Sequence, residues 1–308
     1  MQVRGAGMWY SELRGSGGKG GLYANGNNIM IADLTLSSDS LRRKDADDNA
    51  ALEGNFGTNS LVQNIWVEHM KVGLWLTANT DGLYVVGARI RDTWADGVNL
   101  YGAVRNTTIS HTNTRNTGDD NMAIWSNGAA SSNNTLRFNT NQLPVLANNF
   151  AVYGGADHKI FDNIGSDTVT SGSGIQLSTR FSPTPFSGTT QVRRNTLNRT
   201  GSYDAGWATT FGGLWIYAEG QAINSAIVID TLDLNNSSYD GVLMSYNQSI
   251  GNLTMNNVKI ATAGNYGLNM SVTGTGNFSN VVVTGTGLGG LNNGAGYNIV
   301  RGSGNSGW

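Results

Sequence analysis

The stretch DTWADGVNLYGAVRNTTISHTNTRNTGDDNMAIWS, residues 92–126, contains two short apolar strands at 98–100 and 122–124. These strands begin 24 positions apart, and an aspartate stands two positions before each of them, Asp96 and Asp120. Asp119 directly precedes Asp120. In a fold that stacks equal repeats, residues one repeat apart become neighbours in space. The stretch therefore predicts that three carboxyl groups meet on adjacent repeats.

The same pattern, a small residue followed by apolar, any and apolar residues, recurs along the chain. Its units begin at Gly73, Gly97, Asn121, Asn149, Gly174, Gly213, Gly241, Gly267 and Gly296, at intervals of 24 to 39 residues. No long stretch follows the 3.6-residue period of a helix. A period in the twenties with short strands is typical of a parallel β-solenoid, in which stacked coils bury a continuous apolar face. The sequence predicts an all-β parallel β-helix, with Asn side chains able to form ladders at its corners.

We expect one domain, residues 1–308, with three parts. Residues 1–60 form N-terminal strands and loops in which the pattern is weak, with strands over 3–10 and 29–36. Residues 61–300 form the regular coils. The longest interval predicts an inserted loop over residues 178–212, which contains two of the three prolines. Loops inserted at one corner of a solenoid commonly wall a cleft.

The composition excludes several classes of function. With 13% charged residues and a net charge of −2, the chain has no basic field for nucleic acid or anionic lipid. It has no Cys, which excludes a disulfide framework and a cysteine–zinc site. No run of 18 apolar residues predicts a membrane span. We expect a monomer without nucleic-acid or membrane partners, and residues 1–5 do not form a signal peptide.

Candidate metal ligands are few. Asp45, Asp47 and Asp48 lie in one loop that could hold a structural calcium ion or could be solvated. His69, His111 and His158 are scattered, so we expect no histidine metal site. We expect no metal at the catalytic residues, and no cofactor to be required.

Alternation within the repeated strands assigns side chains to the two faces. The outward residue of each strand and the residue two positions later form columns that contain many aromatic side chains. Exposing such a row of rings to water is unfavourable unless the rings bind a ligand. Sugar rings present apolar C–H faces to such rings; the alternative is that a loop packs over some of them. The candidate substrate-binding residues are Trp75, Trp94, Asn99, Tyr101, Trp125, Tyr153, Gln176, Trp215 and Tyr217.

The acidic residues beside this column are the candidate catalytic groups Asp96, Asp119 and Asp120. Two carboxylates about 5 Å apart repel by about 3 kcal/mol at an effective dielectric near 20, which would raise the pKa of one of them. Glycoside hydrolysis uses one protonated and one ionised carboxyl group. Stacked aspartates can instead cap turns, and we expect that role for Asp240 in the same column.

Several segments together resemble the mycodextranase/α-1,3-glucanase family, glycoside hydrolase family 87. They are VRGAGMWY (3–10), WVEHMKVGLW (66–75), ADGVNL (95–100), NTGDDNMAIWS (116–126) and LANNFAVYGG (146–155). The resemblance implies a right-handed parallel β-helix, with Asp96, Asp119 and Asp120 as catalytic residues. It also implies a secreted, extracellular bacterial enzyme that cleaves α-1,3-glucan of the mutan or nigeran type internally and with inversion. Residues 40–55 differ from the expected family pattern.

Three alternatives stay open at this point. A polygalacturonase-like hydrolase also uses one Asp and an Asp-Asp pair, and by analogy with it Asp119 would protonate the leaving oxygen while Asp96 and Asp120 activate water. Its Gly-His-Gly and Arg-Ile-Lys elements are absent. A polysaccharide lyase needs a Lys or Arg base, and none lies in the outward columns. A non-catalytic solenoid would only bind glycan.

Overall fold

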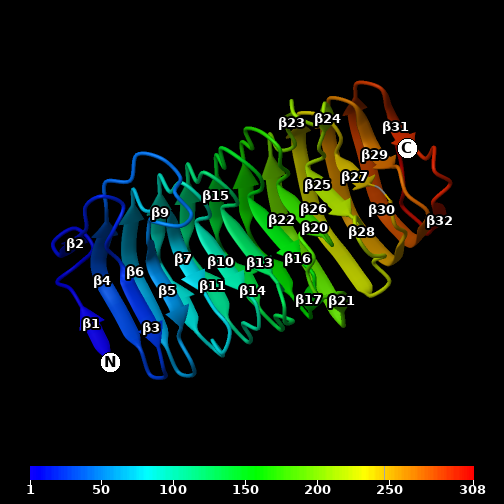
Figure 1. Cartoon of the computed structure of the whole chain (residues 1–308). Coiled ribbons are helices and arrows are strands. Elements are labelled where there is room, and N and C mark those ends of the chain that lie inside the picture. Colours follow the sequence, from blue (N-terminus) through cyan, green and yellow to red (C-terminus); the bar gives the residue numbers. More distant parts are fainter. Residues whose placement is uncertain (246) are drawn as a thin grey trace.

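The computed structural model describes residues 1–245 and 247–308, and within them every regular element is a β-strand. The strands form an elongated solenoid with the two chain ends at opposite ends of the stack (Figure 1). The predicted all-β parallel β-helix is therefore confirmed. Among the described residues, no helix exists that is long and apolar enough to span a membrane.

One sheet contains the repeated apolar strands, and every neighbouring pair in it is parallel. Its strands are β3 (Leu22–Asn25), β5 (Ala50–Asn55), β7 (Val72–Leu76), β10 (Val98–Tyr101), β13 (Met122–Trp125), β16 (Phe150–Tyr153), β20 (Ile175–Ser178), β25 (Leu214–Tyr217), β27 (Val242–Ser245), β29 (Tyr266–Met270) and β31 (Gly289–Asn292). We call it the cleft sheet, because the site described below lies on its outer face.

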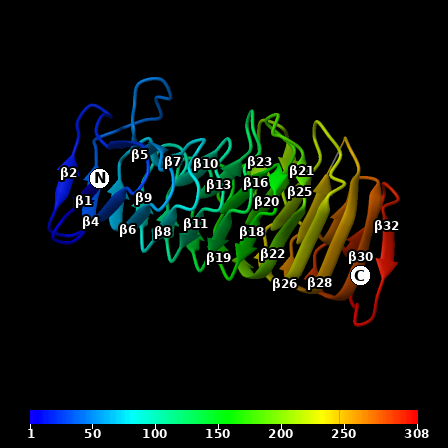
Figure 2. The ribbon, with the colours of Figure 1, turned by 90° about the horizontal axis from the view of Figure 1, so that it is seen from below.

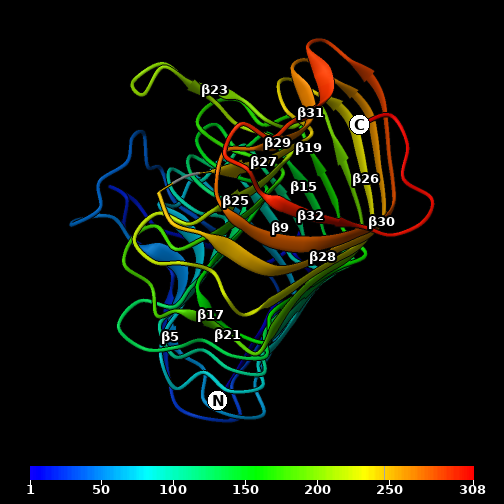
Figure 3. The same ribbon diagram turned by 90° about the vertical axis from the view of Figure 1, so that its right-hand side faces the viewer.

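A second sheet forms the opposite wall of the solenoid, as the end-on view makes plain (Figure 3). Its strands are β1 (Gln2–Arg4), β2 (Glu12–Arg14), β4 (Met30–Ser37), β6 (Leu61–Glu68), β8 (Tyr84–Val86), β9 (Arg89–Arg91), β11 (Thr108–Ser110), β12 (Asn113–Arg115), β14 (Thr135–Arg137), β15 (Thr140–Gln142), β18 (Lys159–Phe161), β19 (Ile164–Ser166), β22 (Thr189–Asn198), β26 (Ala226–Ser237), β28 (Ile250–Ala263), β30 (Gly274–Thr286) and β32 (Asn298–Arg301). Two small pairs complete the fold, β17 (Gly155–Ala156) with β21 (Phe186–Ser187) and β23 (Tyr203–Asp204) with β24 (Thr209–Thr210).

The core lies between the two sheets and follows from the register of the cleft sheet. Leu74, Val98, Met122 and Phe150 are successive Cα partners and are fully buried. Since side chains alternate along a strand, the next residue of each strand faces outward. One coil of this sheet therefore contributes the same kind of side chain to the same face as its neighbours.

The second sheet bends at residues with a left-handed backbone, and most coils have two of them five positions apart, as at Asn64 and His69. The first of the two positions has φ between 48° and 71° and is held in successive coils by Asp33, Asn64, Gly87, His111, Phe138 and Asp162. Asn and Asp tolerate this conformation better than most residues, because their short polar side chains bond locally. The bend turns each strand pair around the core.

A buried asparagine ladder fixes one corner. Asn163 Oδ1 accepts the backbone N–H of Asn139 at 2.9 Å, and Asn195 Oδ1 accepts the backbone N–H of Asn163 at 3.0 Å. Asn163 Nδ2 also donates to the carbonyl of Leu136 at 2.9 Å. The predicted ladder is confirmed, and it pairs buried backbone groups that the corner would otherwise leave unpaired.

Two predicted boundaries are wrong. Regular stacking starts before residue 61, because β4 pairs with β6 and β5 pairs with β7. The segment 178–212 is not one inserted loop, because it contains β22, which pairs in register with β18, β19 and β26. The insertions are the two loops on either side of this strand. The sequence repeat does not predict β22, because the intervals between its apolar units describe only the strands of the cleft sheet.

Two loops project from the same side of the solenoid. One is the loop between β4 and β5, coloured blue, and the other carries the β23–β24 hairpin (Figures 2 and 3). Both leave the body of the fold where the chain approaches the cleft sheet. They are therefore placed to wall the outer face of that sheet.

We predict that Asn163→Ala destabilises the protein by about 2–4 kcal/mol, because it leaves buried backbone groups of Asn139 and Leu136 without partners. The measurement is urea-induced unfolding followed by circular dichroism. Asn277→Ala, on an exposed position of β30, is the matched control and should change the stability by less than about 0.5 kcal/mol. Equal effects of the two substitutions would show that the ladder does not stabilise the corner.

Candidate active site

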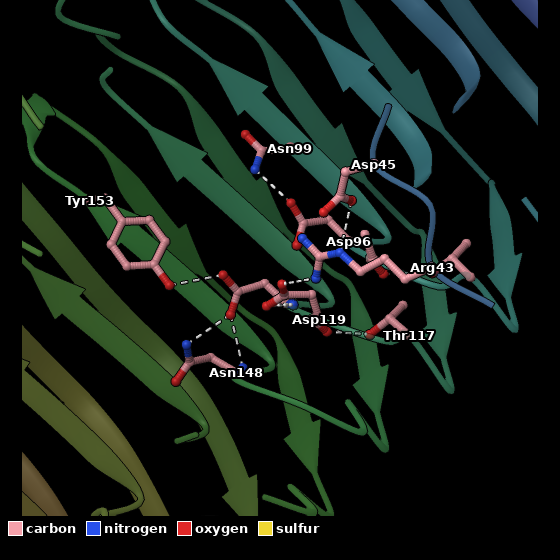
Figure 4. A network of polar contacts seen from close by, with 11 residues as sticks. Arg43, Asp45, Asp96, Asn99, Thr117, Asp119, Asn148 and Tyr153 are labelled. Carbon is pink, nitrogen blue, oxygen red and sulfur yellow. Dashed lines mark hydrogen bonds and ion pairs between the residues drawn. The ribbon is translucent and has the colours of Figure 1, made fainter. Parts of the chain in front are cut away.

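Three carboxyl groups meet on the outer face of the cleft sheet. Asp96 precedes β10 and Asp120 precedes β13, and these strands pair with Val98 opposite Met122. Oxygen atoms of Asp96, Asp119 and Asp120 all lie within 4.8 Å of one another. Asp96 and Asp120 are 8% and 4% exposed, whereas the side chain of Asp119 is 25% exposed. The three residues meet as predicted, and Figure 4 shows Asp96 and Asp119 of this cluster close together.

Asp96 is held from its own coil. Asn99 Nδ2 donates to Asp96 Oδ2 at 2.6 Å. Burial raises the pKa of Asp96 well above its usual value, and the charges of Asp119 and Asp120 raise it further. Asn99 Oδ1 is buried and has no hydrogen-bond partner among the described residues, so an acceptor stays available beside the carboxyl group.

The carboxylate of Asp120 accepts hydrogen bonds from residues of the next coil. Asn148 donates to Asp120 Oδ1 from both its backbone N and its side-chain Nδ2, each at 2.8 Å. Tyr153 Oη donates to Asp120 Oδ2 at 2.9 Å. Burial raises the pKa of Asp120 to about 7, with a further contribution from Asp119 and an opposing one from these hydrogen bonds. Burial also raises the pKa of Tyr153, which keeps the phenol protonated as a donor.

A cation that the sequence analysis missed completes the cluster. Arg43 Nη1 donates to Asp119 Oδ2 at 2.7 Å, and Arg43 Nε donates to Asp45 Oδ1 at 2.9 Å. Arg43 comes from the loop between β4 and β5, and it reaches across to the Asp119 carboxylate in Figure 4. Nothing local in the sequence relates residues 43 and 119, so no motif could have revealed the contact.

Two hydrogen bonds hold the loop that carries Arg43 against the solenoid. Trp94 Nε1 donates to the carbonyl of Ser40 at 2.7 Å, and Lys71 Nζ donates to the carbonyl of Asp45 at 2.8 Å. Trp94, a predicted sugar contact, is therefore an anchor for this loop and does not line the cleft. The loop position is fixed by the body of the solenoid.

The cluster opens into a cleft of about 440 Å³. Trp75 lies on β7, one coil before Asp96, and Phe181 packs against Tyr153, one coil beyond Asp120. Trp125 lies on the coil of Asp120 itself. Five acidic and two basic side chains line it, so the wall is acidic overall: Asp45, Glu53, Asp96, Asp119, Asp120, Arg43 and Lys71. The predicted contacts Asn99, Trp125, Trp75 and Tyr153 are all part of the lining.

The aromatic column is continuous only in its first half. The ring of Tyr101 stacks on Trp75 at 5.2 Å and contacts the edge of Trp125 at 5.2 Å. These rings are partly exposed, as expected. Tyr153 is buried beside Phe181 and acts as the donor to Asp120. Gln176 is also buried, and its Oε1 accepts from Asn148 Nδ2 at 2.8 Å.

The prediction of exposed rings is wrong for Trp215 and Tyr217, each of which is 2% exposed. Phe211, in the loop after β24, packs on Trp215 with 4.4 Å between ring centroids. Trp215 in turn stacks on Tyr217 at 4.7 Å. The alternative, that a loop covers part of the column, is correct here. Sequence alternation gives the face of a side chain but does not reveal what packs over it.

The acidic residues also raise the question of a metal ion. Asp96, Asp119 and Asp120 are the one group of at least three acidic or histidine side chains, within the described ranges, whose ligand atoms converge. Their oxygens are already engaged by Arg43, Asn99, Asn148 and Tyr153, so the positive charge that such a cluster needs comes from Arg43. That the catalytic residues bind no metal stays a prediction.

The loop residues expected to hold calcium turn in different directions. Asp45 accepts from Arg43, and Asp48 Oδ2 accepts from Ser40 Oγ at 2.8 Å. Calcium binding in this loop stays a prediction. Asp240, expected to cap a turn, accepts the backbone N–H of Tyr266 at 3.1 Å and the Asn269 side chain at 2.9 Å, and this expectation is confirmed.

Comparison with known proteins identifies a family. The family model described as alpha-1,3-glucanase catalytic domain D2 matches residues 1–291. One similar structure is the catalytic unit of a thermostable GH87 alpha-1,3-glucanase from Streptomyces thermodiastaticus strain HF3-3. The two sequences are 31% identical, and the structures superpose with a TM-score of 0.92. The match covers 100% of this chain and 59% of that chain. No curated protein matches the chain.

Two further solved structures are catalytic domains of GH87 alpha-1,3-glucanase with sugars bound. The complex with tetrasaccharides has 29% identity and a TM-score of 0.90, and the complex with nigerose has 29% identity and a TM-score of 0.88. Both cover 100% of this chain, which spans 61% and 60% of theirs. The chain thus spans about three fifths of the length of the relatives it matches.

Four of the matched structures are alanine variants, at three aspartates that are separated by 23 residues and by 1 residue. Asp96, Asp119 and Asp120 have the same two separations. The three aspartates of this chain thus have the same spacing as the positions substituted in those relatives.

We predict that Arg43→Met moves the ionisation of Asp96 to higher pH by about one unit, because the Arg43 charge lowers the pKa of Asp96 and opposite charges typically shift a pKa by about 1–3 units. Carboxyl carbon NMR across a pH titration measures the change. Arg42→Met, at the exposed neighbouring residue, is the control and should leave the titration unchanged. An unchanged titration in Arg43→Met would mean that Arg43 does not balance the cluster.

Proposed function

Because the chain belongs to the family of alpha-1,3-glucanase catalytic domains, we propose that it hydrolyses α-1,3-glucosidic bonds of an α-glucan of the mutan or nigeran type. The observation that carries the proposal is the convergence of Asp96, Asp119 and Asp120 within 4.8 Å in a cleft walled by Trp75 and Trp125. Matched catalytic domains bind nigerose and tetrasaccharides, which supports a glucan as the substrate.

The character of the cleft supports a neutral polysaccharide. Five acidic side chains against two basic ones would repel a polyuronate, which argues against a polygalacturonase-like activity. A lyase would need a cation free to act as a base. Arg43 is bound by two carboxylates, and Lys71 donates to a backbone carbonyl. Glucan rings instead offer C–H faces to Trp75 and Trp125, and hydroxyl groups to the polar side chains.

We assign the two catalytic tasks to different carboxyl groups. Asp96 and Asp120 are buried, face one another from adjacent coils, and together hold and deprotonate one water molecule. Asp119 is the most exposed of the three, and it protonates the oxygen of the leaving sugar. The reaction uses water and the protein's own side chains and needs no cofactor.

The contact between Arg43 and Asp119 adds one requirement to this assignment. The Arg43 guanidinium occupies Asp119 Oδ2, one of the two oxygens from which a proton could be given to the leaving sugar. For Asp119 to protonate a leaving oxygen, Arg43 must release it when the glucan enters the cleft. Since Arg43 also binds Asp45 in its own loop, the released guanidinium keeps a partner.

Inversion is proposed from this division of tasks. Carboxyl groups about 5–5.5 Å apart are typical of retaining enzymes and those about 6.5–9.5 Å apart of inverting ones, and the closest oxygens here lie within 4.8 Å. Asp119 lies as close as the other two in this structure, so inversion requires its side chain to move away from the pair when Arg43 releases it. The attacked carbon then lies between this water and Asp119, as an in-line displacement requires.

Aromatic rings on both sides of the cluster suit a chain that continues in both directions, which supports cleavage within the polymer. Because such a polymer is too large to enter a cell, we propose that the protein acts as a secreted bacterial enzyme. We further propose that it works as a monomer, since the three aspartates and both walls come from one chain.

We predict that the protein releases reducing sugars from α-1,3-glucan without unsaturated products, and that the first product formed is the β-anomer. Colorimetry, ultraviolet absorbance and proton NMR measure these three outcomes, with pectin as the comparison substrate. Activity on pectin alone, or absorbance from unsaturated ends, would overturn the proposed substrate or reaction. Formation of the α-anomer first would overturn inversion.

We also predict that Asp119→Asn loses about 10²–10⁴-fold in activity on glucan but keeps most activity on an activated aryl α-glycoside. The leaving group of that substrate needs no proton, so loss of the acid matters little. Asp96→Asn and Asp120→Asn should lose both activities, because activation of water fails. Equal loss on both substrates in Asp119→Asn would show that Asp119 is not the acid.

A further inference from the structure

A second hollow, of about 160 Å³, lies on the cleft sheet beyond the active site. Its walls include Trp207, Thr209 and Thr210 from the β23–β24 hairpin, and Trp215, Asn269 and Ser271 from the sheet. Trp215 was expected to contact sugar and Asp240 to cap a turn, and both line this hollow. Its chemistry is unused by the catalytic groups described above.

The register places this hollow on the same face as the active site. Trp215 is the Cα partner of Gln176 and of Leu243, and Leu243 is the partner of Asn269. This is the outward column that begins with Trp75 and Asn99. Asp240, at the base of the hollow, stands two residues before β27, as Asp120 stands before β13. Four coil steps separate these strands, which corresponds to about 19 Å at the usual strand spacing.

A line of rings joins the two sites. Phe181 lines the active-site cleft, and the guanidinium of Arg180 lies 4.4 Å from the Phe181 ring. The same guanidinium lies 4.1 Å from the ring of Trp207, which lines the second hollow. Arg180 thus lies against both rings and bridges the wall of the cleft to the wall of the hollow.

The hollow offers one ring above a rigid polar floor. Trp207 is 46% exposed, and its position is set by its backbone N–H, which donates to Asp204 Oδ1 at 2.8 Å. Asn269 is held by Asp240 at 2.9 Å, and Trp215 Nε1 donates to Ser245 Oγ at 2.7 Å. The burial of Trp215 under Phe211 therefore builds the base of the hollow.

This combination fits a sugar unit. An exposed indole ring matches the C–H face of a pyranose, and the Thr, Ser and Asn groups match its hydroxyls. A floor whose side chains are already oriented needs little ordering when a ligand binds. The distance along the face from the catalytic residues is one that several linked glucose units can span.

We propose that this hollow is a distal subsite that binds a glucose unit of the same α-1,3-glucan chain that is cleaved at Asp96, Asp119 and Asp120. The inference rests on the proposed function and extends it, because it makes the enzyme selective for long chains. A polymer that occupies both sites is retained on the solenoid face between cleavages. A short oligosaccharide fills the catalytic cleft alone.

The test compares Trp207→Ala with Phe138→Ala on two substrates, a long α-1,3-glucan and an α-1,3-linked trisaccharide. Phe138 is a matched control, because it is 47% exposed and lies on the opposite sheet between β14 and β15. In Trp207→Ala we expect KM for the polymer to rise about two- to tenfold, the range expected for loss of one aromatic contact, with kcat unchanged. Both constants for the trisaccharide should stay at the wild-type value.

Two results would overturn the distal subsite. One is a Trp207→Ala enzyme that matches Phe138→Ala on the polymer. The other is an equal loss on polymer and trisaccharide, since this would mean that Trp207 supports the catalytic cleft itself.

A binding measurement separates this inference from the proposed function. Asp120→Asn, with and without Trp207→Ala, is run through gels that contain soluble α-1,3-glucan, so that retardation reports binding without cleavage. Weaker retardation on loss of Trp207 supports the subsite even if the wild type hydrolyses no glucan, a result that would overturn only the catalytic proposal. Equal retardation in the two proteins overturns the subsite while leaving the catalytic proposal intact.

Discussion

The in-register stacking of parallel strands is the constraint on which the rest of this structure depends. Backbone hydrogen bonds hold neighbouring coils about 4.8 Å apart, and a shift of one residue would exchange the inward and outward faces. Because Val98 pairs with Met122, the aspartates two residues earlier in each strand must also be neighbours. The same register carries Leu74, Met122 and Phe150 into the core. One pattern therefore fixes both the stability of the fold and the position of its acidic residues.

This stacking forces carboxyl groups together at an electrostatic cost. Asp96 and Asp120 have raised pKa values in the folded protein, so their contribution to stability is greatest in acid and declines as pH rises from the unfolded value of 3.8 through the folded value, about 7 for Asp120. The surrounding donors reduce this cost. Asn99, Asn148 and Tyr153 accommodate the buried charges, and Arg43 binds Asp119. The site is held in an unfavourable arrangement by a scaffold that does not depend on it.

The parts of the molecule that the sequence predicts are those that depend on local repetition. Strand pairing in the cleft sheet, the inward and outward columns and the meeting of Asp96 with Asp120 all follow from one interval in the sequence. The contact of Arg43 with Asp119 joins residues 76 positions apart through an irregular loop, and no periodicity describes that path. For the same reason the sequence leaves open which rings a loop covers, and the structure shows that Phe211 packs on Trp215, which stacks on Tyr217. The strand β22 was not predicted, because it belongs to the second sheet and the repeated pattern describes only the cleft sheet.

The loops thus give different properties to a face that the coils alone would make uniform. Outward columns of one sheet repeat the same geometry in every coil, so the sheet by itself offers no reason for chemistry at one place and not another. The loop between β4 and β5 brings Arg43 to Asp119. Asp240 stands in the same column as Asp120, but its carboxylate accepts hydrogen bonds from Tyr266 and Asn269 and caps a turn. The β23–β24 hairpin closes over the column farther along and turns exposed rings into the floor of a hollow. An equivalent aspartate becomes a candidate catalyst or a structural cap according to the loop above it, and selectivity along this face is therefore determined by insertions between coils rather than by the coils themselves.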